Sequence, residues 1–356
     1  MQRSLLAALM IMTAAPGIDA APASIGGCTS KAQARVLCGF RSPEDLAQVP
    51  GTGAVIVSEY GDAEGKRPGL ISLIAPDSGK RRVLYRGTEP PAAKTPGWGD
   101  PACPGPAGRK FSPHGIDINT RTDGRLALAV VQHGRRESVE LFEITQKSGA
   151  VRLTWRGCVV APADAWMNDV ALLGDGSLVA THMTSRAAGF EALFSGAGGP
   201  GHALHWSPSG GWRDLPGTEG RTPNGVEVSA DDLTAFVVYS GEALVRRYDL
   251  ASGRVTGRVP VPGPDNLTWT GDGKLIASSV RRMSAEAFAK CRWLEKGGCP
   301  IAFDVLRVDP ESLAVASVYA YDGPLFGSPS VALQLDRMLL VGSGVGDRIL
   351  RTPPAR

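Results

Sequence analysis

Short aliphatic and β-branched runs alternate with turn residues along the whole chain. Each run is bounded by Gly, Pro, Asp or Asn, a pattern that is typical of β-strands. Six such runs are Ala54–Ser58, Leu126–Val131, Ser177–Thr181, Leu233–Tyr239, Lys274–Ser279 and Met338–Gly342. After the second run, partner strands are expected at Val139–Ile144 and Val151–Trp155.

Each of the six runs ends a phrase that recurs along the sequence. Each phrase begins with small or polar residues and continues through an aliphatic stretch. A turn, for example at Asp123-Gly124, then leads into the strand. The openings lie at positions 44, 114, 168, 224, 266 and 328. Self-similarity with a period of this order is typical of propellers and solenoids. Six phrases, each supplying two strands of a four-stranded blade, predict an all-β, six-bladed β-propeller around a central channel.

Three segments depart from the strand pattern. Ser284–Leu294 is a candidate helix inserted in the fifth blade, and Ala187–Gly201 predicts a mobile inserted loop. Thr88–Lys110 is rich in Pro and Gly and directly precedes the second opening. We therefore expect it to be a long loop that covers the site.

Composition sharpens this picture. The 356 residues include 45 Gly and 27 Pro, with 43% hydrophobic residues, which fits a folded, turn-rich protein and excludes disorder and coiled coil. Length alone suggests two or three domains, but the repeat predicts one domain over residues 21–356. The net charge of +3 gives no reason to expect a nucleic-acid partner.

The N-terminus predicts export. A basic start is followed by an apolar run from Leu5 to Ala15 and by small residues, which indicates a signal peptide over residues 1–20, with cleavage possible as late as 23. The alternative is an uncleaved anchor. No later segment approaches 18 apolar residues, so we expect no transmembrane segment and a secreted or periplasmic protein.

Six cysteines suit an exported chain. Cys291–Cys299 is the best local guess for a disulfide, because these two residues close a short loop. Ile25-Gly26-Gly27-Cys28 weakly resembles a lipidation box, but lipidation at Cys28 would leave an odd cysteine.

The phrase openings carry most of the candidate chemistry. The first strands of propeller blades begin at one mouth of the channel, so carboxylates and carboxamides at the openings converge there. Calcium takes six to eight oxygen ligands of this kind. The alternative is that these Asn and Asp residues serve only in turns. The candidates are Glu44, Asp45, His114, Asn168, Asp169, Asn224, Asp265 and Asn266.

These residues stand in motifs that resemble the paraoxonase/arylesterase family from about residue 42 to 350. The matching stretches are Ser42-Pro43-Glu44-Asp45-Leu46, Ser112-Pro113-His114-Gly115-Ile116, Val130-Val131-Gln132-His133, Ser138-Val139-Glu140-Leu141-Phe142, Met167-Asn168-Asp169-Val170, Asn224-Gly225, Pro264-Asp265-Asn266 and Gly327-Ser328-Pro329-Ser330-Val331-Ala332. The Asn-Gly and Asp-Asn pairs are shared more widely with gluconolactonase and strictosidine-synthase propellers.

The resemblance implies two calcium ions in the channel of a hydrolase of lactones and aryl esters. The catalytic calcium would be held by Glu44, Asn168, Asn224, Asp265 and Asn266, and the structural calcium by Asp45, Asp169 and the Ile116 carbonyl. The family's histidine pair falls on His114 and His133. The chain departs from the family in having no cysteine after Cys299 and no aromatic residues just before Asn224, which leaves the substrate open.

The groups themselves suggest a mechanism. Calcium would stabilise the oxyanion, and His114 would activate water, since histidine titrates near a working pH. His133 would assist or be purely structural, and Asp265 is the alternative base. The chain has no Gly-x-Ser-x-Gly motif for a serine nucleophile. Two other functions stay open, a sugar lactonase of the gluconolactonase type and a non-catalytic, calcium-stabilised interaction platform.

Overall fold

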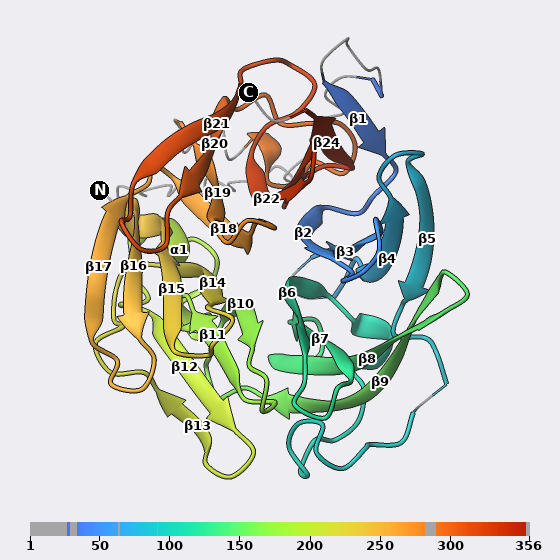
Figure 1. Cartoon of the computed structure of the whole chain (residues 1–356), viewed down its shortest axis with the longest axis vertical. Helices are drawn as coiled ribbons and strands as arrows, with labels where there is room; N and C mark the ends of the chain where they lie inside the picture. Colours follow the sequence, from blue (N-terminus) through green and yellow to red (C-terminus); the bar gives the residue numbers. More distant parts are fainter. Residues whose placement is uncertain (1–26, 29–33, 63–64, 91, 282–289, 354–356) are drawn as a thin grey trace, which may run out of the picture.

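The computed structural model describes residues 27–28, 34–62, 65–90, 92–281 and 290–353. Within them, six antiparallel sheets of four strands each stand around a central axis (Figure 1). This confirms the predicted six-bladed β-propeller. The strands are β1 (Arg35–Cys38), β2 (Pro43–Gln48), β3 (Val55–Glu59), β4 (Leu70–Ala75), β5 (Lys80–Tyr85), β6 (Pro113–Thr120), β7 (Leu126–Gln132), β8 (Ser138–Lys147), β9 (Ala150–Val160), β10 (Met167–Leu172), β11 (Leu178–His182), β12 (His202–Ser207), β13 (Gly211–Asp214), β14 (Pro223–Val228), β15 (Thr234–Tyr239), β16 (Leu244–Asp249), β17 (Val255–Pro260), β18 (Pro264–Trp269), β19 (Leu275–Val280), β20 (Phe303–Val308), β21 (Val315–Tyr321), β22 (Pro329–Leu335), β23 (Met338–Ser343) and β24 (Arg348–Thr352).

The innermost strands form the wall of the channel. β2, β6, β10, β14, β18 and β22 contact one another in a closed ring, and each is the first strand of blades one to six (Figure 1). Every predicted phrase opening falls at the beginning of one of these strands, and every predicted run coincides with the second strand of a blade. The recurring phrase in the sequence is therefore the inner half of a blade.

The two ends of the chain close the ring. Blade six combines β22, β23 and β24 with β1 in the order β1-β24-β23-β22. β1 runs antiparallel to β24, with Arg35 opposite Arg351 and Cys38 opposite Arg348. Pairing between the first and the last strand of the described chain therefore closes the ring.

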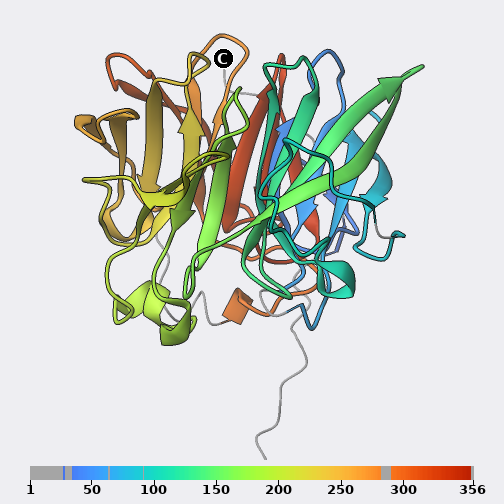
Figure 2. The same cartoon turned by 90° about the horizontal axis from the view of Figure 1, so that it is seen from below.

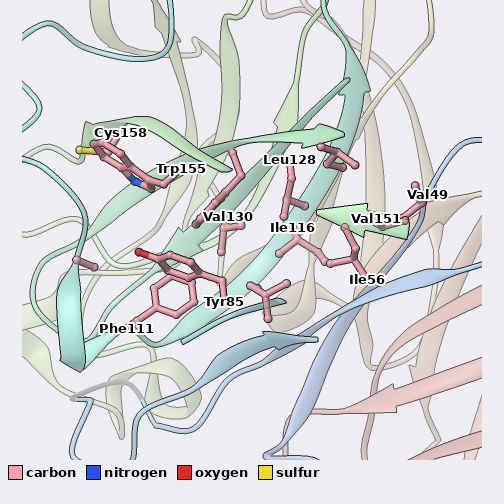
Figure 3. Packing of buried hydrophobic residues seen from close by; sticks show 14 of the residues in the cluster. Val49, Ile56, Tyr85, Phe111, Ile116, Leu128, Val130, Val151, Trp155 and Cys158 are labelled. Atoms are coloured by element: carbon pink, nitrogen blue, oxygen red, sulfur yellow. The ribbon is translucent and has the colours of Figure 1, made fainter. Parts of the chain in front are cut away.

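Apolar packing holds the blades together. Six clusters of buried side chains each draw their members from two adjacent blades. The cluster in Figure 3 joins blades one and two: Val49 and Ile56 come from the first blade, and Leu128, Val130 and Trp155 come from the second. Each fully buried side chain of this size contributes about 1.5–3 kcal/mol relative to exposure. The blades are therefore wedged against one another around the channel.

All six cysteines are paired, as Cys28–Cys38, Cys103–Cys158 and Cys291–Cys299. The third pair is the one predicted from the sequence. Cys28 bonds to Cys38, which leaves no free thiol there for a lipid. Three disulfides are typical of an oxidising compartment. Of the helices in the described segments, none has the length and apolarity needed to cross a membrane.

The irregular segments lie at the blade ends. The 3-10 helix η1 (Gly108–Lys110) ends the long Pro- and Gly-rich loop, η3 (Ser240–Glu242) follows β15, and η2 (Arg186–Ala188) and the short helix α1 (Ala192–Ser195) form the insertion between β11 and β12. That insertion, predicted as a loop, thus contains helical turns. The predicted helix at Ser284–Leu294 lies outside the described residues up to 289, and so does the predicted signal peptide.

Candidate active site

All six inner strands begin with the same backbone irregularity. Their pairing with the second strand shifts register directly after the first residue, at Pro43, Pro113, Met167, Pro223, Pro264 and Pro329. Such a bulge interrupts the ladder and redirects side chains. Except for His133, which follows β7, the predicted site residues lie within or at the edge of these bulges. The chain therefore bends at Glu44–Asp45 in the first blade and at Asn168–Asp169 in the third.

A cavity of about 1010 Å³ lies at the channel mouth where these strands begin. Five of the predicted site residues line it, namely Glu44, His114, Asn168, Asn224 and Asp265. The other predicted residues are buried and do not line the cavity, namely Asp45, Ile116, His133, Asp169 and Asn266. The structure thus gathers side chains from blades one to five around one end of the channel.

Four buried oxygen atoms at this mouth have no hydrogen-bond partner among the described residues. They are Glu44 Oε2, Asn168 Oδ1, Asn224 Oδ1 and Asn266 Oδ1. Leaving a buried acceptor unpaired costs about 1–3 kcal/mol, so such atoms are rare in folded proteins. All four belong to the set predicted to hold the catalytic calcium.

The amide nitrogens of the same asparagines are engaged. Asn266 Nδ2 donates to Glu44 Oε1 at 3.0 Å, and Asn168 Nδ2 donates to the Met183 sulfur at 3.5 Å. The Asn224 side chain is hydrogen-bonded to the Asp265 carboxylate. Each amide is therefore anchored through its nitrogen, and its oxygen is left bare. Unpaired oxygens from one carboxylate and three amides are ligands of the kind that a hard cation such as calcium prefers.

Asp45 and Asp169 form a second layer that connects neighbouring blades. Asp45 accepts hydrogen bonds from the backbone N–H groups of Leu46 at 2.8 Å and Ile116 at 2.7 Å. Asp169 does the same with Val170 at 2.8 Å and Val226 at 2.9 Å. Each carboxylate thus links its own strand to the inner strand of the next blade. An ionised carboxylate has about four acceptor positions, so each one retains capacity for a cation.

The acidic groups of the channel shift one another's proton affinity. Burial raises the pKa of Asp45 and of Asp265 to about 7. Burial, together with repulsion from neighbouring carboxylates, raises the pKa of Glu44 and of Asp169 well above the usual range. Repulsion within such a cluster of buried carboxyl groups is relieved either by protonation or by binding of a cation. Within the described residues no three or more His, Cys, Asp and Glu side chains are arranged as a metal site.

The two predicted catalytic histidines are in direct contact. His133 Nε2 lies 2.9 Å from His114 Nδ1, and the His114 ring stacks on Tyr60 with centroids 4.7 Å apart. His114 Nε2 lies 3.6 Å from Glu44 Oε1. Burial lowers the pKa of His114 well below its usual value and that of His133 to about 3. Both rings are therefore neutral at neutral pH, the state from which His114 can accept a proton.

Several cavity residues were not anticipated from the sequence. Trp166, Arg186, Phe190 and Trp293 line the cavity together with Tyr60. The segment with α1 and the orange segment just beyond residue 290 both project below the propeller in Figure 2, on the side of this cavity. Their sequences carry no periodic signal that would place them there. Loop residues of this kind reach a site only through the fold that carries them.

One expectation about the cavity wall was wrong. None of the described residues of the loop 88–110 lines the cavity. The loop instead follows β9, where the Thr95 and Asp100 N–H groups donate to the carbonyls of Arg156 and Cys158. His182, at the end of β11, accepts a hydrogen bond from the Trp166 backbone at 3.0 Å and does not line the cavity.

Comparisons with known proteins show the fold alone. No family model matches the sequence, and no curated protein does. A candidate gluconolactonase is similar over 91% of this chain and 93% of its own, with a TM-score of 0.51 and 18% identity. A luciferin-regenerating enzyme is similar over 90% of this chain and 95% of its own, with a TM-score of 0.53 and 13% identity. Regucalcin from Agrobacterium tumefaciens, a calcium-binding protein, gives a TM-score of 0.46 at 15% identity over 90% of this chain and 93% of its own, too remote to carry an argument. The first two likenesses agree with a propeller built from the same six blades.

Proposed function

We propose that this chain is a calcium-dependent lactone hydrolase. The observation that carries the proposal is the set of four buried, unpaired oxygens beside a hydrogen-bonded histidine pair. Glu44, Asn168, Asn224, Asp265 and Asn266 would hold one calcium at the base of the cavity. Asp45, Asp169 and the Ile116 carbonyl would hold a second, structural ion. Calcium at the first position supplies a Lewis acid for the substrate carbonyl and its oxyanion.

The protein's own groups supply the rest of the chemistry. His114 lines the cavity and is neutral, so its ring can take a proton from a water molecule as the water oxygen bonds to the lactone carbonyl carbon. When the ring C–O bond of the lactone breaks, the same proton passes to the departing alkoxide. His133 does not line the cavity and acts only through His114. Asp265, also on the cavity wall, is the alternative base.

The proposed substrate is a lactone, and among lactones a sugar lactone has the better support. The support comes from the similar structure described as a candidate gluconolactonase. Aryl esters, which the resemblance to paraoxonases adds, have no corresponding support. The histidine pair still favours the paraoxonase type, so hydrophobic acyl lactones are the second candidate.

A substrate panel with and without calcium tests the proposal. We expect hydrolysis of gluconolactone or of a hydrophobic acyl lactone to stop in excess chelator and to return with added calcium. Phenyl acetate serves as the aryl ester in the same panel. Full activity in excess chelator would contradict the calcium dependence. No turnover of any panel member by the calcium-loaded protein would favour the non-catalytic platform.

We also place this activity outside the cytoplasm. The three disulfides support an oxidising compartment, and the signal peptide over residues 1–20 remains a prediction. Mass spectrometry of the protein exported by its host would show a mature N-terminus between residues 21 and 24.

A further inference from the structure

We propose that Glu137 is a positioning residue that fixes the ring and tautomer of His133 and thereby orients His114 as the base. This inference rests on the proposed hydrolase function, because it assigns Glu137 a role in the same reaction. Glu137 lies in the turn between β7 and β8, four residues after His133, and contacts neither the cavity nor any proposed calcium ligand.

Three different parts of the fold fix the Glu137 carboxylate. Its Oε1 lies 2.7 Å from His133 Nδ1, and its Oε2 accepts a hydrogen bond of 3.2 Å from the N–H of Met167, the first residue of β10. Arg186, in the insertion that lines the cavity, forms an ion pair with the same carboxylate. Only 8% of the Glu137 side chain is exposed, and His133 is fully covered. A carboxylate held on so many sides has little freedom to turn away.

These contacts determine which nitrogen of each ring carries the proton. An ionised Glu137 only accepts, so His133 must carry its proton on Nδ1. A neutral His133 then has a lone pair on Nε2, which accepts from Nδ1–H of His114 at 2.9 Å. His114, also neutral, is left with an unprotonated Nε2, close to Glu44 at the channel mouth. This nitrogen is the one that can receive a proton from water.

Aromatic packing keeps the two rings in place but does not choose their tautomers. Tyr60 stacks on His114 and meets the edge of His133 with centroids 5.8 Å apart. Ring contacts of this kind restrict rotation and are indifferent to which nitrogen is protonated. Among the contacts of the His133 ring, Glu137 is therefore the group that sets the tautomer, in the way that a carboxylate behind a catalytic histidine does in other hydrolases.

Kinetics of Glu137→Gln measures this role. The amide that replaces the carboxylate has only one acceptor oxygen, so its NH2 group must face either Met167 N–H or the side of His133 and Arg186, all of which are donors, and the uncharged amide should hold His133 less firmly. We expect kcat to fall about 10- to 100-fold with KM unchanged, and Glu137→Asp to recover part of the loss. Glu143→Gln is the matched control, because Glu143 lies in β8 and pairs with Arg156 away from the cavity. Unchanged kcat in Glu137→Gln would overturn the proposal.

Nitrogen NMR of histidine-labelled protein gives a readout that is independent of turnover. The chain has only five histidines, which can be assigned by single substitutions. In the wild-type protein we expect His133 to be protonated on Nδ1 and not on Nε2, and Glu137→Gln to shift these signals. His133 protonated on Nε2 in the wild-type protein would overturn the inference even if the variants failed to fold. A wild-type protein that shows the expected tautomer but hydrolyses no lactone would instead contradict the proposed function.

Discussion

Asn266 and Glu44 lie 222 residues apart in the chain, yet the Asn266 amide donates a 3.0 Å hydrogen bond to Glu44 Oε1. This contact joins blade five to blade one, and each partner keeps one buried oxygen unpaired. We predict that Asn266→Ala weakens calcium binding at least about tenfold, or about 1.4 kcal/mol, because it removes one ligand and releases another. Asn119→Ala is the control, since Asn119 also lies on an inner strand but bonds to the Leu172 carbonyl. Equal calcium affinity of both variants in calorimetry would contradict the assignment.

Calcium should stabilise the protein more at high pH than at low pH. Burial raises the pKa of Asp45 and Asp265 to about 7, above the value near 4 in an unfolded chain. The folded state therefore binds these protons more tightly, and the resulting stabilisation is lost as the pH rises from about 4 to 7. Calcium replaces the protons, so the rise in Tm on adding calcium should be larger at pH 8 than at pH 5.5. Thermal unfolding at both pH values checks this, and equal increments would argue against a carboxylate-held ion.

His114→Gln should separate catalysis from metal binding. The variant keeps a polar side chain of similar reach but removes the titratable nitrogen, so turnover should fall about 100-fold or more. The calcium-dependent rise in Tm should persist, because His114 is not among the proposed ligands. Measured together, turnover and Tm show which role the residue has. A joint loss of both would make His114 a structural residue.

Gly225 permits the close approach of blades four and five. A Cβ at this position would lie 2.6 Å from Asn266 Cα and 2.9 Å from the Asp265 carbonyl oxygen. Gly225→Ala should therefore push the fifth inner strand away, costing about 1–3 kcal/mol of stability and weakening calcium binding. Gly271→Ala is the matched control, because a Cβ there meets nothing within 4 Å. Urea unfolding with and without calcium distinguishes the two, and similar losses would show that packing at Gly225 is unimportant.

The Cys103–Cys158 disulfide should stabilise the fold without affecting catalysis. It closes a loop with a sequence separation of 55 and ties the Pro- and Gly-rich segment to β9. Replacing both residues by Ser should lower the free energy of unfolding by about 2–4 kcal/mol. Activity of the folded variant should match the wild type, because neither residue lines the cavity. A selective loss of activity would mean that the loop reaches the site after all.

The fold could be predicted from the sequence because a propeller repeats one local unit. Each inner strand and its hairpin partner are encoded in a short phrase, as in Asn168–Asp169 followed by Asp175-Gly176 and then β11. The same repetition placed Glu44, Asn168, Asn224 and Asp265 at equivalent positions, so their convergence could be predicted once six blades were counted. The short loop between Cys291 and Cys299 was equally local, and that disulfide followed.

What the sequence left undetermined depends on contacts between distant segments. Glu137 does not differ from any surface acid in sequence, and only the packing of β10 and of the insertion against the β7–β8 turn brings it to His133. The loop 88–110 carried no periodicity, so its position along β9 rather than over the cavity was set by backbone hydrogen bonds and the Cys103–Cys158 bond. Local patterning thus determined the blades and the polar ring at their inner ends, whereas tertiary packing decided the cavity wall and the partners of the histidines.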